Sequence, residues 1–215
     1  MIIKVCGLRE PDNIRAVEAL GADMTGLIFY PRSPRFVSHS LPHRMEKKSE
    51  RVGVFVNATI DDMLRKAGEY CLDCIQLHGS ESPDLLKDLC KAFICKGLKK
   101  PKLIKAFNIS ATEDLSRTRE YEGVADLFLF DTKTEHAGGS GQKFDWNILN
   151  AYNGNTKFLL SGGIGPGDAA EISAFSHPMM TGIDLNSRFE QEPGIKDIGA
   201  LSSFLHKIHA IYKRE

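Results

Sequence analysis

Short runs of aliphatic and β-branched residues recur along the chain, and each run is followed by polar residues or glycine. Eight of these runs have the length and composition that predict β-strands. They cover residues 2–6, 25–29, 51–56, 74–77, 103–107, 127–131, 158–161 and 181–185.

Longer amphipathic stretches lie between these runs and predict helices. They cover residues 11–20, 60–70, 83–89, 112–121, 167–174 and 198–212. Several begin with residues that favour a helix N-terminus, such as Thr59, Ser82 and Asp168. Two further segments, 38–50 and 145–152, are poor helix candidates, because the first has proline near its start and the second is short.

The alternation of strand and helix defines the predicted fold. Eight strand-then-helix units in 215 residues leave about 27 residues for each unit. Alternation at this density implies parallel strands joined by right-handed crossovers. An open doubly wound sheet usually has about five or six strands, so eight favour closure. We therefore predict an α/β fold, a (β/α)8 TIM barrel, with residues 1–215 forming a single domain.

Composition and charge are typical of a folded chain and argue against some classes of binding partner. The sequence is 42% hydrophobic and 26% charged, which is typical of a globular protein and not of a disordered one. Its 28 Lys and Arg residues balance 28 Asp and Glu residues, so the net charge is zero. Because a chain without net charge has no overall electrostatic field to attract polyanions, we expect neither nucleic acid nor a membrane surface as a partner. No apolar run reaches the roughly 20 residues that span a bilayer.

The cysteine count and the N-terminus indicate a compartment. Five cysteines are an odd number, and the N-terminal residues lack the pattern of a signal peptide. We therefore expect a cytoplasmic protein with reduced thiols. Cys71 and Cys74 have the spacing of a metal or redox pair, but one closes a predicted helix and the other starts a strand. We expect both to pack in the core and no metal to bind.

Chemistry in such a barrel is expected at the C-terminal ends of the strands. Cys6 ends the first predicted strand and is either a small buried hydrophobe or a thiolate that acts as nucleophile or base. Asp131 ends the sixth and is either an ion-pair partner or an acid or base. A thiol and a carboxyl group on separate sides of the ring could move protons on a small substrate between them.

Glycines near the last strands indicate a phosphate site. Clusters at 138–141 (GGSG) and 161–165 (SGGIG) let backbone amides approach an anion, and Asn186 and Ser187 follow the eighth strand at the same corner. Glycine also simply makes turns. No Gly-Lys-Ser or Gly-Lys-Thr follows the glycines, so the site is not of the Walker type.

Two further candidates lie at strand ends. Arg35 belongs to a loop that two prolines stiffen, and a guanidinium there either binds a carboxylate or phosphate or is solvated surface charge. His78 follows the fourth strand, and both a structural and a catalytic histidine fit that position.

These residues, in this order, resemble the phosphoribosylanthranilate isomerase family, whose members are single-domain barrels of tryptophan biosynthesis. The resemblance covers nearly the whole chain. It rests on KVCGL at 4–8, SPRFV at 33–37, VGVFVN at 52–57, IQLHG at 75–79, FD at 130–131, GGSG at 138–141 with FDW at 144–146, LSGGI at 160–164 and DLNS at 184–187.

The resemblance implies a cofactor-free Amadori rearrangement of N-(5'-phosphoribosyl)anthranilate, an aldosylamine, to the corresponding ketose. By this resemblance Asp131 is the general acid that opens the ribose ring, Cys6 is the base that removes the C2 proton, and Arg35 holds the anthranilate carboxylate. The remaining residues implied in substrate binding are His78, Gly139, Ser140, Gly162, Gly163, Asn186 and Ser187. The expected partner is thus a small molecule, and we expect a monomer because the helices leave no long apolar stripe.

One position departs from the family pattern. Family members usually follow the serine at 187 with Gly-Val-Glu, whereas this chain has Arg188-Phe189-Glu190. Arg188 either adds a guanidinium at the phosphate or points to solvent. Two other functions compete: an aldose–ketose isomerase like that of histidine biosynthesis, which usually has aspartate where Cys6 stands, and a barrel that binds phosphate ligands without catalysis.

Overall fold

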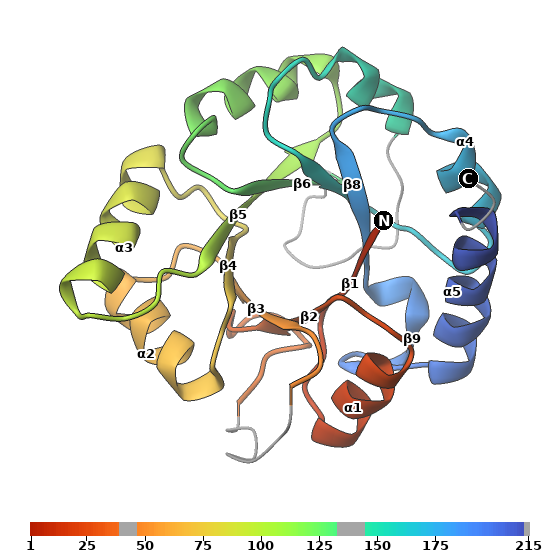
Figure 1. The fold of residues 1–215 in the computed structure, drawn as a ribbon, viewed down its shortest axis with the longest axis horizontal. Helices are drawn as coiled ribbons and strands as arrows, with labels where there is room; N and C mark the ends of the chain where they lie inside the picture. The colour runs from red at the N-terminus through yellow and green to blue at the C-terminus, as the bar shows by residue number, and fades with distance from the viewer. Residues whose placement is uncertain (39–46, 133–144, 213–215) are drawn as a thin grey trace.

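The computed structural model describes residues 1–38, 47–132 and 145–212 and forms a closed barrel of eight parallel strands. The strands follow one another around the ring in chain order, and the last pairs with the first (Figure 1). They are β1 (Ile2–Val5), β2 (Met24–Ile28), β3 (Glu50–Phe55), β4 (Cys74–Leu77), β5 (Lys102–Ile109), β6 (Leu127–Thr132), β7 (Phe158–Leu160) and β8 (Met180–Leu185). The predicted barrel and its eight strands are confirmed, with ends that shift by one or two residues.

Helices surround the barrel on its outer side (Figure 1). The α-helices are α1 (Pro11–Ala19), α2 (Ile60–Tyr70), α3 (Pro83–Cys95), α4 (Ala169–Ala174) and α5 (Ile198–Tyr212). The 3₁₀ helices are η1 (Thr112–Tyr121), η2 (Trp146–Ala151) and η3 (Ser187–Phe189). Among the described residues, no helix combines the length and apolarity that crossing a membrane would require.

Two predicted helices differ from the observed ones. Helix α3 runs beyond the predicted end at residue 89, because Phe93 extends the buried stripe that Leu86 and Leu89 begin. Segment 112–121 forms a 3₁₀ helix, in which the hydroxyl groups of Ser116 and Thr118 donate to carbonyl oxygens three residues back. Of the two poor helix candidates, 145–152 contains η2, and most of 38–50 lies outside the described residues.

A small hairpin after the eighth strand was not predicted. Strands β9 (Glu190–Glu192) and β10 (Ile195–Lys196) pair antiparallel and turn through Gly194, whose φ is +93°. Their short, charged sequence has none of the apolar runs by which the barrel strands were predicted. The hairpin matters because it carries Glu190 and Lys196 toward the barrel mouth.

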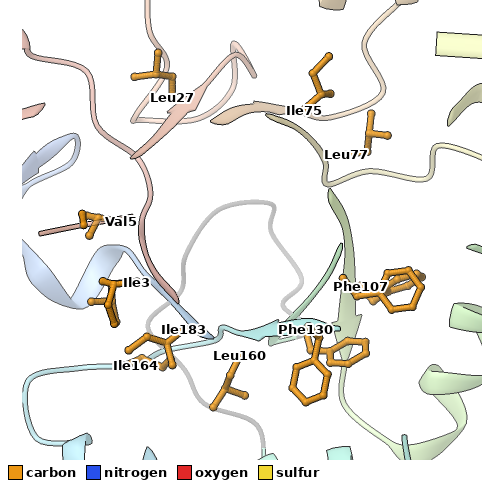
Figure 2. Close-up of a cluster of buried hydrophobic side chains, with 14 of the residues drawn as sticks. Ile3, Val5, Leu27, Ile75, Leu77, Phe107, Phe130, Leu160, Ile164 and Ile183 are labelled. Carbon is orange, nitrogen blue, oxygen red and sulfur yellow. The ribbon is translucent and has the colours of Figure 1, made fainter. Parts of the chain in front are cut away.

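The strands sort their side chains onto two faces by simple alternation. Ile3 and Val5 point outward into the large core between barrel and helices, where Figure 2 shows them with Leu27, Leu160 and Phe130. The inward-facing positions form a separate cluster inside the barrel. Its buried members are Cys6, Met24, Val52, Val54, Cys74, Ile104, Ala106, Leu129 and Leu159. Lys4 on β1 and Cys6 directly after it lie on either side of Val5 in the sequence and thus share the inward face.

Candidate active site

Cys6 lies directly after β1 on the inward face of the barrel and is only 3% exposed. The neighbouring strand leaves room for its thiol at Gly26. A side chain at position 26 would begin 2.7 Å from the Cys6 sulfur and 3.0 Å from its Cα atom. Glycine on β2 is therefore the sequence feature that admits a cysteine side chain at this point of the wall.

Buried charges surround this thiol. The pKa of Cys6 is raised overall, because burial and the carboxylate of Asp184 raise it by more than the ammonium groups of Lys4 and Lys196 lower it. Lys4 is fully buried, and its Nζ donates to Asp184 Oδ1 at 2.7 Å, while Ser161 Oγ donates to Asp184 Oδ2 at 3.2 Å. Burial alone would lower the pKa of Lys4, but Asp184 and Cys6 together raise it. The thiol therefore shares the barrel interior with an ammonium group that stays charged.

Arg35 is held by a carboxylate of this chain. Its Nε donates to both oxygens of Glu190, at 2.9 and 3.0 Å, and its Nη2 donates to Oε2 at 2.6 Å. Lys196 Nζ donates to Glu190 Oε1 at 2.7 Å and to Asn186 Oδ1 at 2.8 Å. Burial raises the pKa of Glu190, and its two cationic neighbours outweigh that effect and lower it. The guanidinium predicted to meet a substrate carboxylate thus has two of its nitrogens on Glu190.

Gly7 allows these groups to approach one another. Its φ is +76°, and a side chain there would begin 2.5 Å from Asn186 Oδ1 and 2.7 Å from Arg35 Cδ. Position 7 therefore combines a backbone conformation that glycine favours with a lack of space for any other residue. It brings the ends of β1 and β8 and the loop after β2 together.

Asp131 and His78 meet on another part of the mouth. Asp131 Oδ1 accepts from the amide of Thr132 at 2.8 Å, and Oδ2 lies 3.4 Å from His78 Nε2. Each of the two side chains is 25% exposed, in contrast to Cys6. Gln76, two residues earlier on β4, places its amide nitrogen 3.0 Å from His78 Nδ1. The structure thus brings the predicted residues Asp131 and His78 together and places Gln76, which was not predicted, next to His78.

The structure describes part of the predicted phosphate site. Gly162 and Gly163 follow β7 with φ of +90° and +69°, so the chain turns there through glycine conformations. The amide of Gly165 is already taken, because it donates to Asp168 Oδ2 at 2.6 Å. Gly139 and Ser140 lie outside the described residues.

Residues after β8 complete this site. Ser187 begins η3, and the Asn186 oxygen is engaged by Lys196, which leaves the amide nitrogen as the Asn186 group suited to an anion. Arg188 is exposed, and its Nε lies 3.3 Å from the point where a Gly165 side chain would begin. Arg188 therefore lies against the loop after β7 while remaining open to solvent.

Burial of the Cys71 and Cys74 side chains differs in part from the prediction. All five thiols are free, and Cys74 is buried as expected, but Cys71 is exposed. The expectation that both pack in the core is therefore wrong for Cys71. Its backbone takes the left-handed conformation with φ of 50° as it ends α2, so the chain turns there before entering the core. Within the ranges that the structure describes, no group of three or more His, Cys, Asp or Glu side chains could hold a metal ion.

The charged residues around Cys6 were missed because they sit inside predicted strands. Lys4 interrupts the apolar run 2–6, and Asp184 interrupts 181–185. A charged residue in such a run signals a polar position within the strand, but it identifies neither the face on which the side chain lies nor its partner. Glu190 and Lys196 gave no such signal, since they belong to the polar hairpin.

Comparisons with known proteins agree on one family. Residues 3–207 match the family model described as N-(5'phosphoribosyl)anthranilate (PRA) isomerase. An N-(5'-phosphoribosyl)anthranilate isomerase of Parabacteroides distasonis is 54% identical over 213 residues, which is 97% of this chain and 93% of the relative.

Solved structures agree with the sequence comparison. The phosphoribosyl anthranilate isomerase of Thermus thermophilus superposes with a TM-score of 0.82 at 25% sequence identity. The superposition covers 98% of this chain and 100% of the Thermus chain. Another phosphoribosyl anthranilate isomerase, solved in complex with reduced 1-(o-carboxyphenylamino)-1-deoxyribulose 5-phosphate, has a TM-score of 0.76 at 26% identity, covering 98% and 100% of the two chains.

Proposed function

The chain belongs to the N-(5'-phosphoribosyl)anthranilate isomerase family, and we propose that Asp131 and Cys6 are the acid and the base of its rearrangement. The enzyme is an isomerase of tryptophan biosynthesis. Its reaction converts the aldosylamine N-(5'-phosphoribosyl)anthranilate into an aminoketose. The observation that carries the proposal is the pairing of a buried thiol beside ammonium groups with a water-accessible carboxyl group at another strand end of the same mouth.

The acid step opens the sugar ring. Asp131 gives its proton to the ring oxygen of the ribose, the bond between that oxygen and C1 breaks, and the anthranilate nitrogen supplies the electron pair that forms an iminium ion. Asp131 is left as a carboxylate. Its 25% exposure gives it contact with water, from which it can recover a proton for the next turnover.

The base step moves the second proton. The Cys6 thiolate removes the proton from C2, the C2 electron pair neutralises the iminium ion, and the resulting enolamine tautomerises to the ketone. Burial keeps the pKa of Cys6 raised overall, so the thiolate needs compensating charge, and Lys4 and Lys196 supply part of it by lowering that pKa. The positive iminium ion formed in the first step acts in the same direction.

Substrate binding uses the remaining residues of the mouth. We assign the anthranilate carboxylate to Arg35, whose orientation Glu190 fixes through Nε and Nη2. We assign the phosphate to the amides of Gly162 and Gly163, to Asn186 and Ser187, and to Gly139 and Ser140 outside the described residues. His78 lies at the edge of this set, beside Asp131. The relative solved with a reduced carboxyphenylamino-deoxyribulose phosphate supports a ligand with these same anionic groups.

Activity measured with enzymatically generated phosphoribosylanthranilate tests the assignment, because its anthranilate-type fluorescence changes on isomerisation. Cys6→Ser and Asp131→Asn are each expected to lower turnover by about 10²- to 10⁴-fold, the usual contribution of a general acid or base. Both should still bind the substrate. Cys74→Ser is the matched control, since Cys74 is a second buried thiol on the inward face of the barrel but lies at the start of β4, away from the C-terminal strand ends.

Three outcomes would contradict the proposal. Near wild-type turnover in Cys6→Ser or Asp131→Asn would remove the corresponding group from the mechanism. An equal loss in Cys74→Ser would show that any change to the interior thiols impairs the barrel. Binding without isomerisation in the unaltered protein would favour a barrel that binds ligands without catalysis.

We further propose that residues 1–215 act as one catalytic domain and as a cytoplasmic monomer with a small-molecule substrate. The five free thiols support a reducing compartment. Among the described residues, the exposed large hydrophobic side chains are Met1, Ile94 and Leu98, which are few for a stable interface. Sedimentation at micromolar concentration would overturn the monomer if it gave twice the chain mass.

A further inference from the structure

Gln76 is a buried polar side chain inside the barrel wall. It lies on β4 between Ile75 and Leu77, which pack outward, so its own side chain is on the inward face. It is 1% exposed. Its Nε2 lies 3.0 Å from His78 Nδ1, and its Oε1 has no hydrogen-bond partner among the described residues. A buried amide with an unpartnered oxygen calls for an explanation in terms of what its nitrogen does.

The amide nitrogen determines which ring nitrogen of His78 carries the proton. A glutamine NH2 group can only donate, so Nδ1 of His78 must accept through its lone pair. In the neutral ring the proton then sits on Nε2. In the opposite amide orientation, Oε1 would face Nδ1 of His78 and the NH2 group would take the position that Oε1 occupies now. That position offers no hydrogen-bond partner in the part of the chain that the structure describes, so two N–H donors would be left unsatisfied. One unpartnered acceptor costs less than two unpartnered donors.

The protonated Nε2 faces the proposed acid. It lies 3.4 Å from Asp131 Oδ2, while the other oxygen of Asp131 accepts from the amide of Thr132 at 2.8 Å. The first contact is longer than an ordinary hydrogen bond, and such contacts commonly shorten when charge develops during the reaction. Charge develops on Asp131 when it gives up its proton.

We propose that Gln76 sets the tautomer of His78 and that His78 in turn holds Asp131, so that both are positioning residues for the acid step. The Nε2–H group of His78 stabilises the carboxylate that remains after Asp131 has protonated the ring oxygen, an interaction stronger in the transition state than in the resting enzyme. This inference rests on the proposed role of Asp131. It also gives His78 a function other than direct contact with the substrate.

Nitrogen-15 NMR of the histidine-labelled protein tests the tautomer without reference to activity. At a pH where His78 is neutral, the wild type is expected to show a protonated Nε2 and an unprotonated Nδ1. His78→Gln identifies the signals by their loss. In Gln76→Glu the carboxylate can only accept, so it is expected to draw the proton to Nδ1 or to make the ring cationic. A wild-type ring protonated at Nδ1 would overturn the inference.

Kinetics tests the effect on Asp131. His78→Ala is expected to lower kcat by about 10- to 100-fold, the range for a hydrogen bond to a charged group, with little change in KM. His78→Gln keeps an N–H near the position of Nε2 and is expected to recover most of this loss. Gln76→Leu should lower kcat less than His78→Ala. Thr118→Val, which removes a different buried hydrogen bond to Leu115, is the control and should leave kcat unchanged.

The alternatives give different results. If His78→Ala raises KM and leaves kcat unchanged, His78 binds substrate directly and the inference fails. If His78→Gln recovers nothing, the Nε2–H donor is not the group that matters, and the inference fails as well. If instead Asp131→Asn retains turnover, the proposed function fails, while the wild-type tautomer seen by NMR would still report whether Gln76 orients His78.

Discussion

The two sides of the barrel mouth handle charge in opposite ways. On the base side, which comprises Cys6, Lys4, Asp184 and Lys196, the reactive group is buried and has charged neighbours that are buried as well. On the acid side, which comprises Asp131, His78 and Gln76, the carboxyl group is a quarter exposed and faces a histidine. The first side relies on fixed charges and the second on orientation and contact with water.

The difference follows from the ordinary pKa values of the two groups. A thiol titrates near 8.5 in water, and burial moves that pKa further from neutrality, so a buried thiolate needs cations close by. Buried cations in turn need a carboxylate, which Asp184 supplies to Lys4. A carboxyl group that must release and recover a proton gains more from access to water. The base side is thus expected to contribute more to stability than the acid side.

The largest effect on the free energy of unfolding is expected from Lys4→Met. Removing one partner of the buried pair leaves Asp184 uncompensated and should cost about 3–5 kcal/mol of unfolding free energy, measured by urea denaturation. In the proposed mechanism Cys6 acts as a thiolate, so activity should rise as pH rises through its pKa, and Lys4 lowers that pKa. Without Lys4 the rising limb of the kcat/KM profile should therefore move to higher pH, and activity at neutral pH should fall.

Lys105→Met is the matched control for this prediction. Lys105 is also a buried lysine in an ion pair, with Glu81 at 3.0 Å, but its strand position faces outward from the barrel. It should lose comparable stability and leave the Cys6 limb of the pH profile in place. An unshifted limb in Lys4→Met would mean that the base side does not tune the thiol.

A smaller effect is expected from Gly26→Ala. The added Cβ would lie 2.7 Å from the Cys6 sulfur and 3.0 Å from its Cα atom, so both thiol and backbone must shift. Overpacking of this kind costs about 1–3 kcal/mol and should lower turnover by moving the base. Gly68→Ala in α2 meets nothing within 4 Å and is expected to be neutral or slightly stabilising. Equal melting temperatures for the two variants would show that the wall next to Cys6 has space to spare.

The smallest effect on stability is expected from Asp131→Asn, although the proposed mechanism predicts a large loss of turnover for the same variant. The amide oxygen can still accept from Thr132, and the side chain is partly exposed, so the unfolding free energy should change by less than about 1 kcal/mol. Denaturant unfolding of wild type and variant measures this directly. A loss comparable to that of Lys4→Met would remove the contrast between the two sides.

Much of the fold could be read from the chain because its signals are local. Strands appeared as apolar runs ended by glycine or polar residues, and the N-terminal caps at Thr59 and Ser82 hold the helix starts as predicted. The hairpin with Glu190 and Lys196 was missed because short charged strands carry no periodic signal. The tight 3₁₀ form of residues 112–121 was missed because its hydrophobic spacing does not differ enough from that of an α-helix.

The local pattern of the chain was enough to predict a barrel of eight units with Cys6 and Asp131 at strand ends, because strand-helix alternation and turn residues act over a few positions. The surroundings of those two residues depend instead on contacts between distant parts of the chain. Lys4 and Asp184 are 180 positions apart and meet because β8 closes against β1. Arg35 and Glu190 are 155 positions apart and meet across a glycine that leaves no room for a side chain. Ring closure creates these contacts, and a local pattern cannot record which distant charge will neutralise a buried one.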